Sequence, residues 1–122
     1  MTVKPKKRIY IAGPMRGYEY FNYPAFNRAA DAIRNDPELC DIWHVCNPAE
    51  IGNDFTPTPD DLAKAPDLLE RLMEFELAVV KSCDAIYLLR GWEKSEGARA
   101  ELRVALDNKL EIYTEESGRL FR

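Results

Sequence analysis

The sequence predicts an α/β domain in which helices cover both faces of a mostly parallel sheet of four to five strands. Short apolar runs rich in branched residues alternate along the chain with longer amphipathic segments of helical period. Parallel strands need a crossover connection, usually a helix, to bring the chain back to the same edge of the sheet. This alternation is therefore typical of a parallel sheet rather than of hairpins.

Four segments read as strands. The first is residues 8–13, RIYIAG, which is apolar and is followed by a proline. The others are residues 42–45 (IWHV), 85–89 (AIYLL) and 110–113 (LEIY). Each is short and bounded by turn residues, as expected for strands of a buried sheet. The lone histidine, His44, falls in the second strand and is expected to be buried there.

Three segments read as helices, namely residues 24–35, 67–82 and 95–108. The first has a proline near its start, where proline is favoured, and apolar residues at helical spacing: Phe26, Ala29, Ala30 and Ile33. The second shows the same spacing at Leu68, Leu72, Phe75 and Val79, with Glu76 on the adjoining row. Together the elements predict a Rossmann-like three-layer sandwich.

The chain is expected to form a single domain over residues 1–122. Its 122 residues, 46% of them hydrophobic, are enough to bury a core without disulfides or metals. The core of the domain spans about residues 8–114. An irregular loop is expected over 52–66, which is rich in proline, aspartate and threonine, and a polar tail over 115–122, where Leu120 and Phe121 are candidates for docking on a neighbouring subunit.

Composition excludes several classes of function. The net charge of -4 comes from 17 basic and 21 acidic residues, so no nucleic-acid partner is expected. The three cysteines show no CxxC spacing, which predicts buried free thiols and neither a disulfide framework nor a metal site. We also expect no cofactor and no membrane association, because the known nucleotide motifs and long apolar runs are missing. A cytoplasmic location is predicted.

Ligands of parallel α/β sheets bind beyond the carboxyl ends of the strands, so the residues that follow each strand are the candidates for a site. The first such segment is GPMRG, residues 13–17. Gly13 and Gly17 would let the backbone approach a ligand closely, and Arg16 offers a fork suited to phosphate. A purely structural glycine turn explains the same residues.

The segment SEGARAEL, residues 95–102, is a second candidate. Ser95 is placed as a helix N-cap, where its hydroxyl and the first free amides could bind an anion or only cap the helix. Gly97 lies one turn before Glu101 and would leave space in front of its carboxylate. Glu101 lies at the edge of the buried stripe of that helix, where it either meets a substrate or reaches out to water. Because the only histidine, His44, falls in a predicted buried strand, a hydrolase triad is not indicated, and a carboxylate mechanism without a metal is favoured.

These motifs together resemble a known family. IYIAGPMRG, CDAIYLL and SEGARAEL, in this order, are similar to the nucleoside 2-deoxyribosyltransferase superfamily, which includes the 2'-deoxynucleoside 5'-phosphate N-hydrolases. FNYPAFNRAA, NPAEIG and GWEKSEGARAE are especially similar to a small branch found in phages and prophages. The resemblance covers residues 8–114 and implies a cytoplasmic protein of a bacterium or a phage-infected cell.

The resemblance implies roles for individual residues. In that family the glutamate at Glu101 is the nucleophile that attacks the anomeric carbon, and the serine at Ser95 helps to bind the 5'-phosphate. Gly97 and Leu102 complete the same motif. The aspartate that opens the third predicted strand, Asp84, resembles a residue that assists the base or the proton transfer.

Further residues follow from the same resemblance. Gly13, Arg16 and Gly17 match a phosphate-associated motif, and Trp92 is expected to contact the substrate. The chain departs from the phage branch at residues 73–76, which read Met-Glu-Phe-Glu where members often carry Met-Arg-x-Asp. The arginine is missing, and an acidic residue persists at Glu76.

The resemblance implies cleavage or transfer at the N-glycosidic bond of a nucleoside or nucleoside 5'-monophosphate, through a covalent glycosyl-enzyme. A non-catalytic nucleotide-binding or sequestering protein with the same pocket is the alternative. A third is a structural or interaction protein, whose contact residues would be Trp92, Tyr18, Tyr20 and Phe21. A homodimer or higher homo-oligomer is expected. The base, the sugar and the balance between hydrolysis and transfer stay open.

Overall fold

The computed structural model of the chain describes residues 6–52 and 63–115. Most of the predicted irregular loop over 52–66 lies outside the described residues. The same is true of the polar tail after Glu115, including Leu120 and Phe121.

The sheet has four strands in the order β2-β1-β3-β4, and every pair of neighbours is parallel. Tyr10 in the middle of β1 is in register with Cys46 of β2 on one side and with Ile86 of β3 on the other. The order is that of a sheet in which the first strand is central. The strands are β1 (Lys7–Ala12), β2 (Trp43–Cys46), β3 (Ala85–Leu88) and β4 (Glu111–Thr114).

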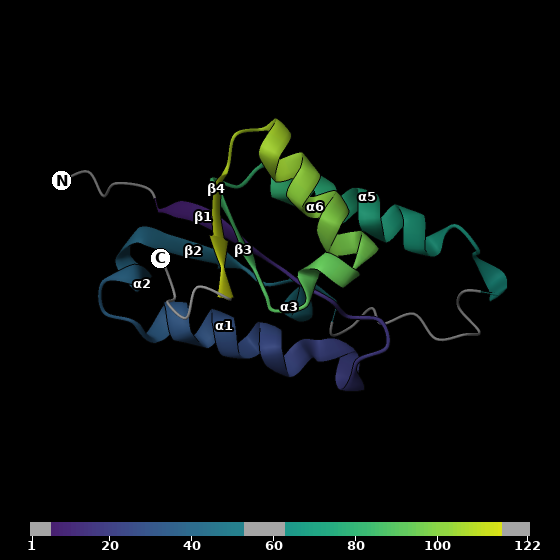
Figure 1. Ribbon diagram of the computed structural model, residues 1–122, viewed down its shortest axis with the longest axis horizontal. Helices are drawn as coiled ribbons and strands as arrows, with labels where there is room; N and C mark the ends of the chain where they lie inside the picture. Colours follow the sequence, from purple (N-terminus) through teal and green to yellow (C-terminus); the bar gives the residue numbers. More distant parts are fainter. Residues whose placement is uncertain (1–5, 53–62, 116–122) are drawn as a thin grey trace.

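Helices lie on both faces of the sheet, which confirms the predicted α/β, Rossmann-like fold class. Figure 1 shows α5 and α6 on one face and α1 and α2 on the other. The long helices are α1 (Tyr23–Asn35), α5 (Leu68–Lys81) and α6 (Glu96–Asp107). Among the described residues, four short helices were not predicted, because three to five residues show no measurable period: η1 (Glu19–Asn22), α2 (Leu39–Ile42), α3 (Pro48–Gly52) and η2 (Trp92–Lys94).

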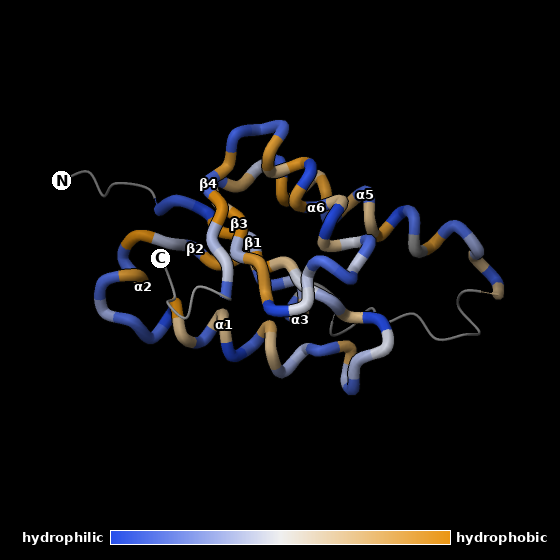
Figure 2. The backbone as a smooth tube through the Cα atoms, in the orientation of Figure 1, coloured by the Kyte–Doolittle hydropathy of each residue, from blue (hydrophilic) through white to orange (hydrophobic). Residues whose placement is uncertain are grey.

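The two faces of the sheet carry separate apolar layers, because successive side chains of a strand point to opposite faces. Ile9 and Ile11 of β1 pack with Phe26 and Ile33 of α1 on one face. Figure 2 shows the strands as the hydrophobic interior between helices whose outer sides are hydrophilic. Side chains on the other face pack against α5 and α6: Tyr10, Ala12, Ile86 and Leu88 meet Val80 and Ala105.

His44 is not buried, contrary to the sequence-based prediction. It is the one exposed residue of β2, between the buried Trp43 and Val45. β2 lies at the edge of the sheet. An edge strand buries the side chains that face a helix and leaves the alternate ones open to solvent.

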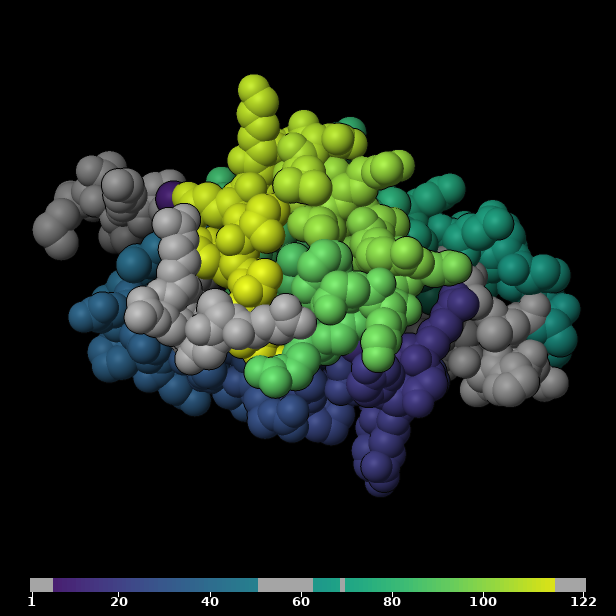
Figure 3. Space-filling view, viewed as in Figure 1, coloured from purple at the N-terminus to yellow at the C-terminus, as the bar shows by residue number. Residues whose placement is uncertain are grey.

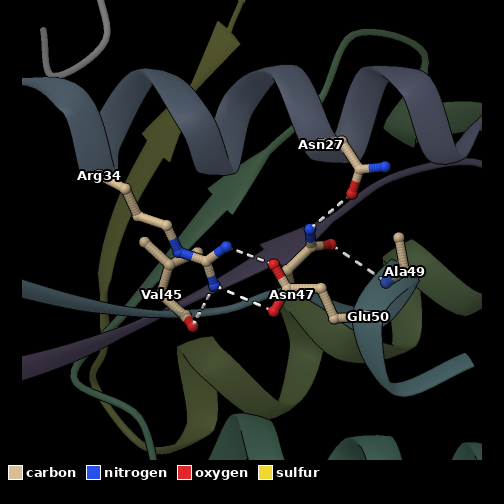
Figure 4. A network of polar contacts seen from close by, with 6 residues as sticks. All are labelled: Asn27, Arg34, Val45, Asn47, Ala49 and Glu50. Carbon is tan, nitrogen blue, oxygen red and sulfur yellow. Dashed lines mark hydrogen bonds and ion pairs between the residues drawn. The ribbon is translucent and has the colours of Figure 1, made fainter.

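A polar network ties the end of β2 to α1 (Figure 4). The buried side chain of Asn47 donates to Asn27 Oδ1 at 3.0 Å and accepts from the backbone N–H of Ala49 at 3.0 Å. Arg34 of α1 forms a two-pronged ion pair with Glu50, in which Nη2 lies 3.0 Å from Oε2. These contacts hold the NPAEIG segment, which includes α3, against α1.

Candidate active site around Glu101

Glu101 lies on the face of α6 that packs against the sheet. Its neighbours on this face are Ala98 and Ala105, which recur at helical spacing. Only 5% of Glu101 is exposed, and Tyr10 is fully buried beside it. The hydroxyl of Tyr10 donates a hydrogen bond to Oε2 of Glu101. The carboxyl therefore turns inward, to a partner on the central strand, and does not extend to water.

Burial controls the protonation of this carboxyl group. It raises the pKa of Glu101 to about 8, and the hydrogen bond from Tyr10 partly opposes that rise. The negative charge of Glu76 raises the pKa further. Burial and the charge of Glu101 also hold the pKa of Tyr10 well above its ordinary value, so the phenol keeps its proton and remains a donor.

Glu76 supplies a second inward-facing carboxyl group, from α5. Burial raises its pKa, and its charge acts on both Tyr10 and Glu101. The prediction that Phe75 lies on the buried stripe of this helix was wrong, since Phe75 is 53% exposed. The helix is instead turned so that Glu76 faces inward. The charge of Glu76 therefore adds to burial in disfavouring the ionised form of Glu101.

The start of α6 confirms the predicted cap. The hydroxyl oxygen of Ser95 accepts from the backbone N–H of Ala98 at 3.1 Å. Gly97 does not leave the empty space expected from the sequence. A Cβ at this position would lie 3.0 Å from Met73 Cε, because α5 packs its methionine over the first turn of α6. A ligand that approaches Glu101 along this path has to displace a flexible methyl group.

The loop after β1 lies at the carboxyl end of the sheet. Gly13 is required by packing, since a Cβ there would lie 2.8 Å from Leu89 Cβ. Gly17 has a φ of +81°, which favours glycine, and Arg16 is exposed. Figure 3 shows this loop against the turn that leads into α6, and a Cβ on Gly91 would lie 3.0 Å from the Tyr18 hydroxyl.

Trp92 lies in η2, between β3 and α6. Its indole ring packs against the apolar layer under α5 and α6. Its Nε1 atom is buried and has no hydrogen-bond partner in the part of the chain that the structure describes. A buried donor without a partner is costly in a folded protein. The position therefore fits the predicted role in substrate contact, which stays a prediction.

Asp84 is not brought to Glu101. It directly precedes β3 and so lies at the amino end of the sheet, away from the loops that follow the strands. Its carboxylate accepts from the backbone N–H of Arg8 at 2.8 Å and is exposed. This contact caps the start of the β1-β3 pair. The structure thus gives Asp84 a structural partner, and it is the charge of a different acid, Glu76, that acts on the pKa of Glu101.

A cleft of about 520 Å³ opens at the carboxyl end of β3, on the face that α1 covers. Glu101 is not among its lining residues and faces the opposite side of the sheet. Arg28 and Arg90 make one wall basic, while Glu115 accepts from the backbone N–H of Arg90 at 2.9 Å. The cleft is lined by Tyr18, Asn22, Ala25, Arg28, Leu89, Arg90, Gly91 and Glu115.

Within residues 6–52 and 63–115, no cluster of histidine, cysteine and acidic side chains could hold a metal ion. None of the helices in these ranges combines the length and the apolar character that crossing a membrane requires.

Comparison with known protein families identifies the family of this sequence. Residues 7–114 match the family described as Domain of unknown function (DUF4406), which is most of the 122-residue chain. The chain belongs to the DUF4406 family. The match spans every strand and helix described above, including Tyr10, Glu76 and Glu101. No curated protein matches the sequence.

One residue of the site in this DUF4406 chain, Tyr10, was not predicted from the sequence. Tyr10 lies in RIYIAG, which reads as an ordinary apolar strand. The available signal was its hydroxyl: a buried tyrosine usually finds a hydrogen-bond partner. The alternation of the strand also puts Tyr10 on one face with Ala12, the face that α6 covers. The partner itself becomes visible only in the folded chain.

The pKa of Glu101 predicts a pH-dependent stability of this DUF4406 domain. The folded-state pKa of about 8 lies above the ordinary value of 4.5. Between these values the folded state holds a proton that the unfolded state releases, so the free energy of unfolding falls as pH rises, by at most about 1.4 kcal/mol per pH unit. Glu101→Gln removes this contribution. We expect urea unfolding from pH 5 to 8 to show that the free energy of unfolding of the variant rises relative to that of the wild type as the pH rises. A difference in free energy that stays constant with pH would refute the raised pKa of Glu101.

Proposed function

We propose that this protein cleaves or transfers the N-glycosidic bond of a nucleoside or nucleoside 5'-monophosphate, with Glu101 as the nucleophile. The observation that carries the proposal is the buried carboxyl of Glu101, which accepts a hydrogen bond from Tyr10 and whose pKa is raised by burial and by the charge of a second acid, Glu76. A glutamate that merely lay at the edge of the buried stripe of a helix would extend its carboxylate to water. The resemblance of SEGARAEL to the deoxyribosyltransferase motif supports the same role.

The reaction would proceed through two displacements at C1' of the sugar. Glu101 attacks C1' and the bond to the base breaks, which gives a covalent glycosyl ester and releases the base. A water molecule or a second base then attacks the same carbon, and Glu101 leaves as a carboxylate. The hydroxyl of Tyr10 holds Oε2, which leaves Oε1 as the oxygen that can attack.

The departing base needs a proton, and Glu76 supports this role better than Asp84. Burial raises the pKa of Glu76, which favours its protonated form, whereas Asp84 is exposed and bonded to the backbone of Arg8. Burial is the main cause of the raised pKa of Glu101, and a proton on Glu76 removes the smaller contribution from its charge. The first displacement requires the ionised form of Glu101, which is favoured as the pH rises toward about 8.

A 5'-phosphate is the proposed anchor of the substrate. The free amides of the first turn of α6 point toward the carboxyl end of the sheet, where the capped helix end favours an anion. Arg16 is exposed in the loop after β1, and Trp92 lies between β3 and α6. These positions support a site in which phosphate binds at the helix end and the base contacts the indole ring.

The assembly and location belong to the proposal as well. Tyr18, Tyr20 and Phe21 expose 46%, 73% and 43% of their surface. Exposed aromatic residues next to a site are typical of protein contacts. We expect a homodimer or higher oligomer that uses this segment, in the cytoplasm of a bacterium or a phage-infected cell.

The activity test compares Glu101→Gln with Glu96→Gln. Glu96 lies on the same helix but is exposed, so it controls for the loss of one carboxylate from α6. Each protein is incubated with nucleosides and their 5'-monophosphates, and the free base is measured by chromatography. We expect base release by the wild type and by Glu96→Gln, and a loss of at least about 10³-fold in Glu101→Gln. Base release by Glu101→Gln at the wild-type rate would refute the nucleophile. Tight binding of a nucleotide with no release by any protein would favour a sequestering role.

The phosphate anchor is tested by Ser95→Asp. Aspartate is as good an N-cap as serine, so α6 should keep its start, but the added charge repels a phosphate. We expect kcat/KM for the monophosphates to fall at least about tenfold while that for the nucleosides is unchanged. Equal losses on both substrate classes, or no loss on either, would remove the phosphate from the proposed site.

A further inference from the structure

Two cysteines far apart in the sequence meet under α5. Cys46 ends β2 and Cys83 directly precedes Asp84 and β3. Their sulfur atoms lie 3.8 Å apart, and both residues belong to the apolar layer on the α5 and α6 face. They are 8% and 7% exposed, so both lie just below the surface. The remaining cysteine, Cys40, is half-buried in α2.

A guanidinium group lies beside this sulfur pair. Nη2 of Arg8 lies 3.4 Å from Cys46 Sγ, and Nη1 of the same side chain donates to Ser82 Oγ at 2.8 Å. A positive charge next to a thiol favours the thiolate, which is the reactive form. The hydrogen bond from Cys83, then that from Arg8, lowers the pKa of Cys46. The same contact raises the pKa of Cys83.

The other charged groups around the pair reinforce this asymmetry. His44 on β2 also lowers the pKa of Cys46. The hydrogen bond to Cys46 and, to a smaller extent, the charge of Asp84 raise the pKa of the Arg8 guanidinium, which keeps it charged. Cys83 Sγ has a second acceptor, the carbonyl of Val79 at 3.2 Å. One sulfur is therefore set up as the nucleophile and the other as a protonated neighbour.

We propose that Cys46 and Cys83 are a redox-active pair that a hydroperoxide oxidises to an intramolecular disulfide. The Cys46 thiolate attacks the terminal oxygen of the hydroperoxide, the O–O bond breaks, and the alkoxide or hydroxide leaves and takes up a proton. Cys46 becomes a sulfenic acid. The sulfur of Cys83 then attacks Cys46 Sγ, the S–O bond breaks, and water leaves with the Cys83 proton. The two thiols lose two electrons and the peroxide gains them.

The disulfide would join the end of β2 to the start of β3 across β1. The sulfur atoms have to close from 3.8 Å to a bond of about 2.05 Å. The bond would close a loop across 37 positions of sequence that carries α3 and α5. Cross-links of such loops restrict the unfolded chain and stabilise the folded one. The pair does not depend on the proposed glycosidic activity.

The test uses the Cys40→Ser chain. No lysine or arginine lies between Cys40 and Cys46, so trypsin leaves both on one peptide, and removing Cys40 makes the cross-link unambiguous. The reduced protein is treated with equimolar hydrogen peroxide at pH 7, its free thiols are alkylated under denaturing conditions, and the digest is analysed by mass spectrometry. We expect the loss of two hydrogen atoms per chain, a peptide pair joined through Cys46 and Cys83, reversal by dithiothreitol, and a higher Tm.

Matched single variants test the order of the steps. Cys83→Ser should trap the sulfenic acid on Cys46, which dimedone labels, and Cys46→Ser should leave Cys83 unlabelled under the same conditions. In the wild-type chain, the free thiols should fall from three to one. The proposal is overturned if both thiols of Cys40→Ser survive the treatment, if they oxidise separately without a cross-link, or if the disulfides join two chains.

Discussion

The hydrogen bond from Tyr10 to Glu101 is the interaction on which this site depends. A carboxyl group inside the apolar layer between a sheet and two helices is costly unless it has a partner. Tyr10, on the inner strand β1, supplies that partner for the face of α6 that packs on the sheet. The same apolar layer raises the pKa values of Glu101 and Glu76. The Tyr10 hydrogen bond therefore gives the carboxyl group a partner, while burial in the same layer raises its pKa.

The sequence was sufficient for the fold because its patterns are local. Four short apolar runs and three amphipathic segments predict the strands and long helices to within a residue or two of their observed ends, and their alternation predicts the parallel sheet. His44 was misplaced because strand order is not a local property. Nothing in IWHV says that this strand lies at an edge, where alternate side chains reach solvent.

The site was predictable only in part, for the same reason. The cap of Ser95 and the position of Glu101 on its helix follow from spacing within one element. Three other residues act on Glu101 or its helix from other elements, and only the folded chain shows them. They are Tyr10, which donates to Glu101, Glu76, whose charge raises the pKa of Glu101, and Met73, which fills the space at Gly97. The position of Asp84 away from the site could have been predicted, since a residue before a parallel strand lies at the amino end of the sheet.

Direct trapping of the glycosyl-enzyme tests the central claim, that Glu101 is the nucleophile. The protein is mixed with a nucleoside monophosphate, quenched in acid and digested with pepsin at low pH, and the peptides are sequenced by tandem mass spectrometry. Glu101 is the only carboxylate between Arg99 and Arg103, so fragment ions across these residues assign an adduct without ambiguity. The account predicts the mass of the sugar phosphate on Glu101. Base release with no adduct there, or with the adduct on Glu76, would contradict it.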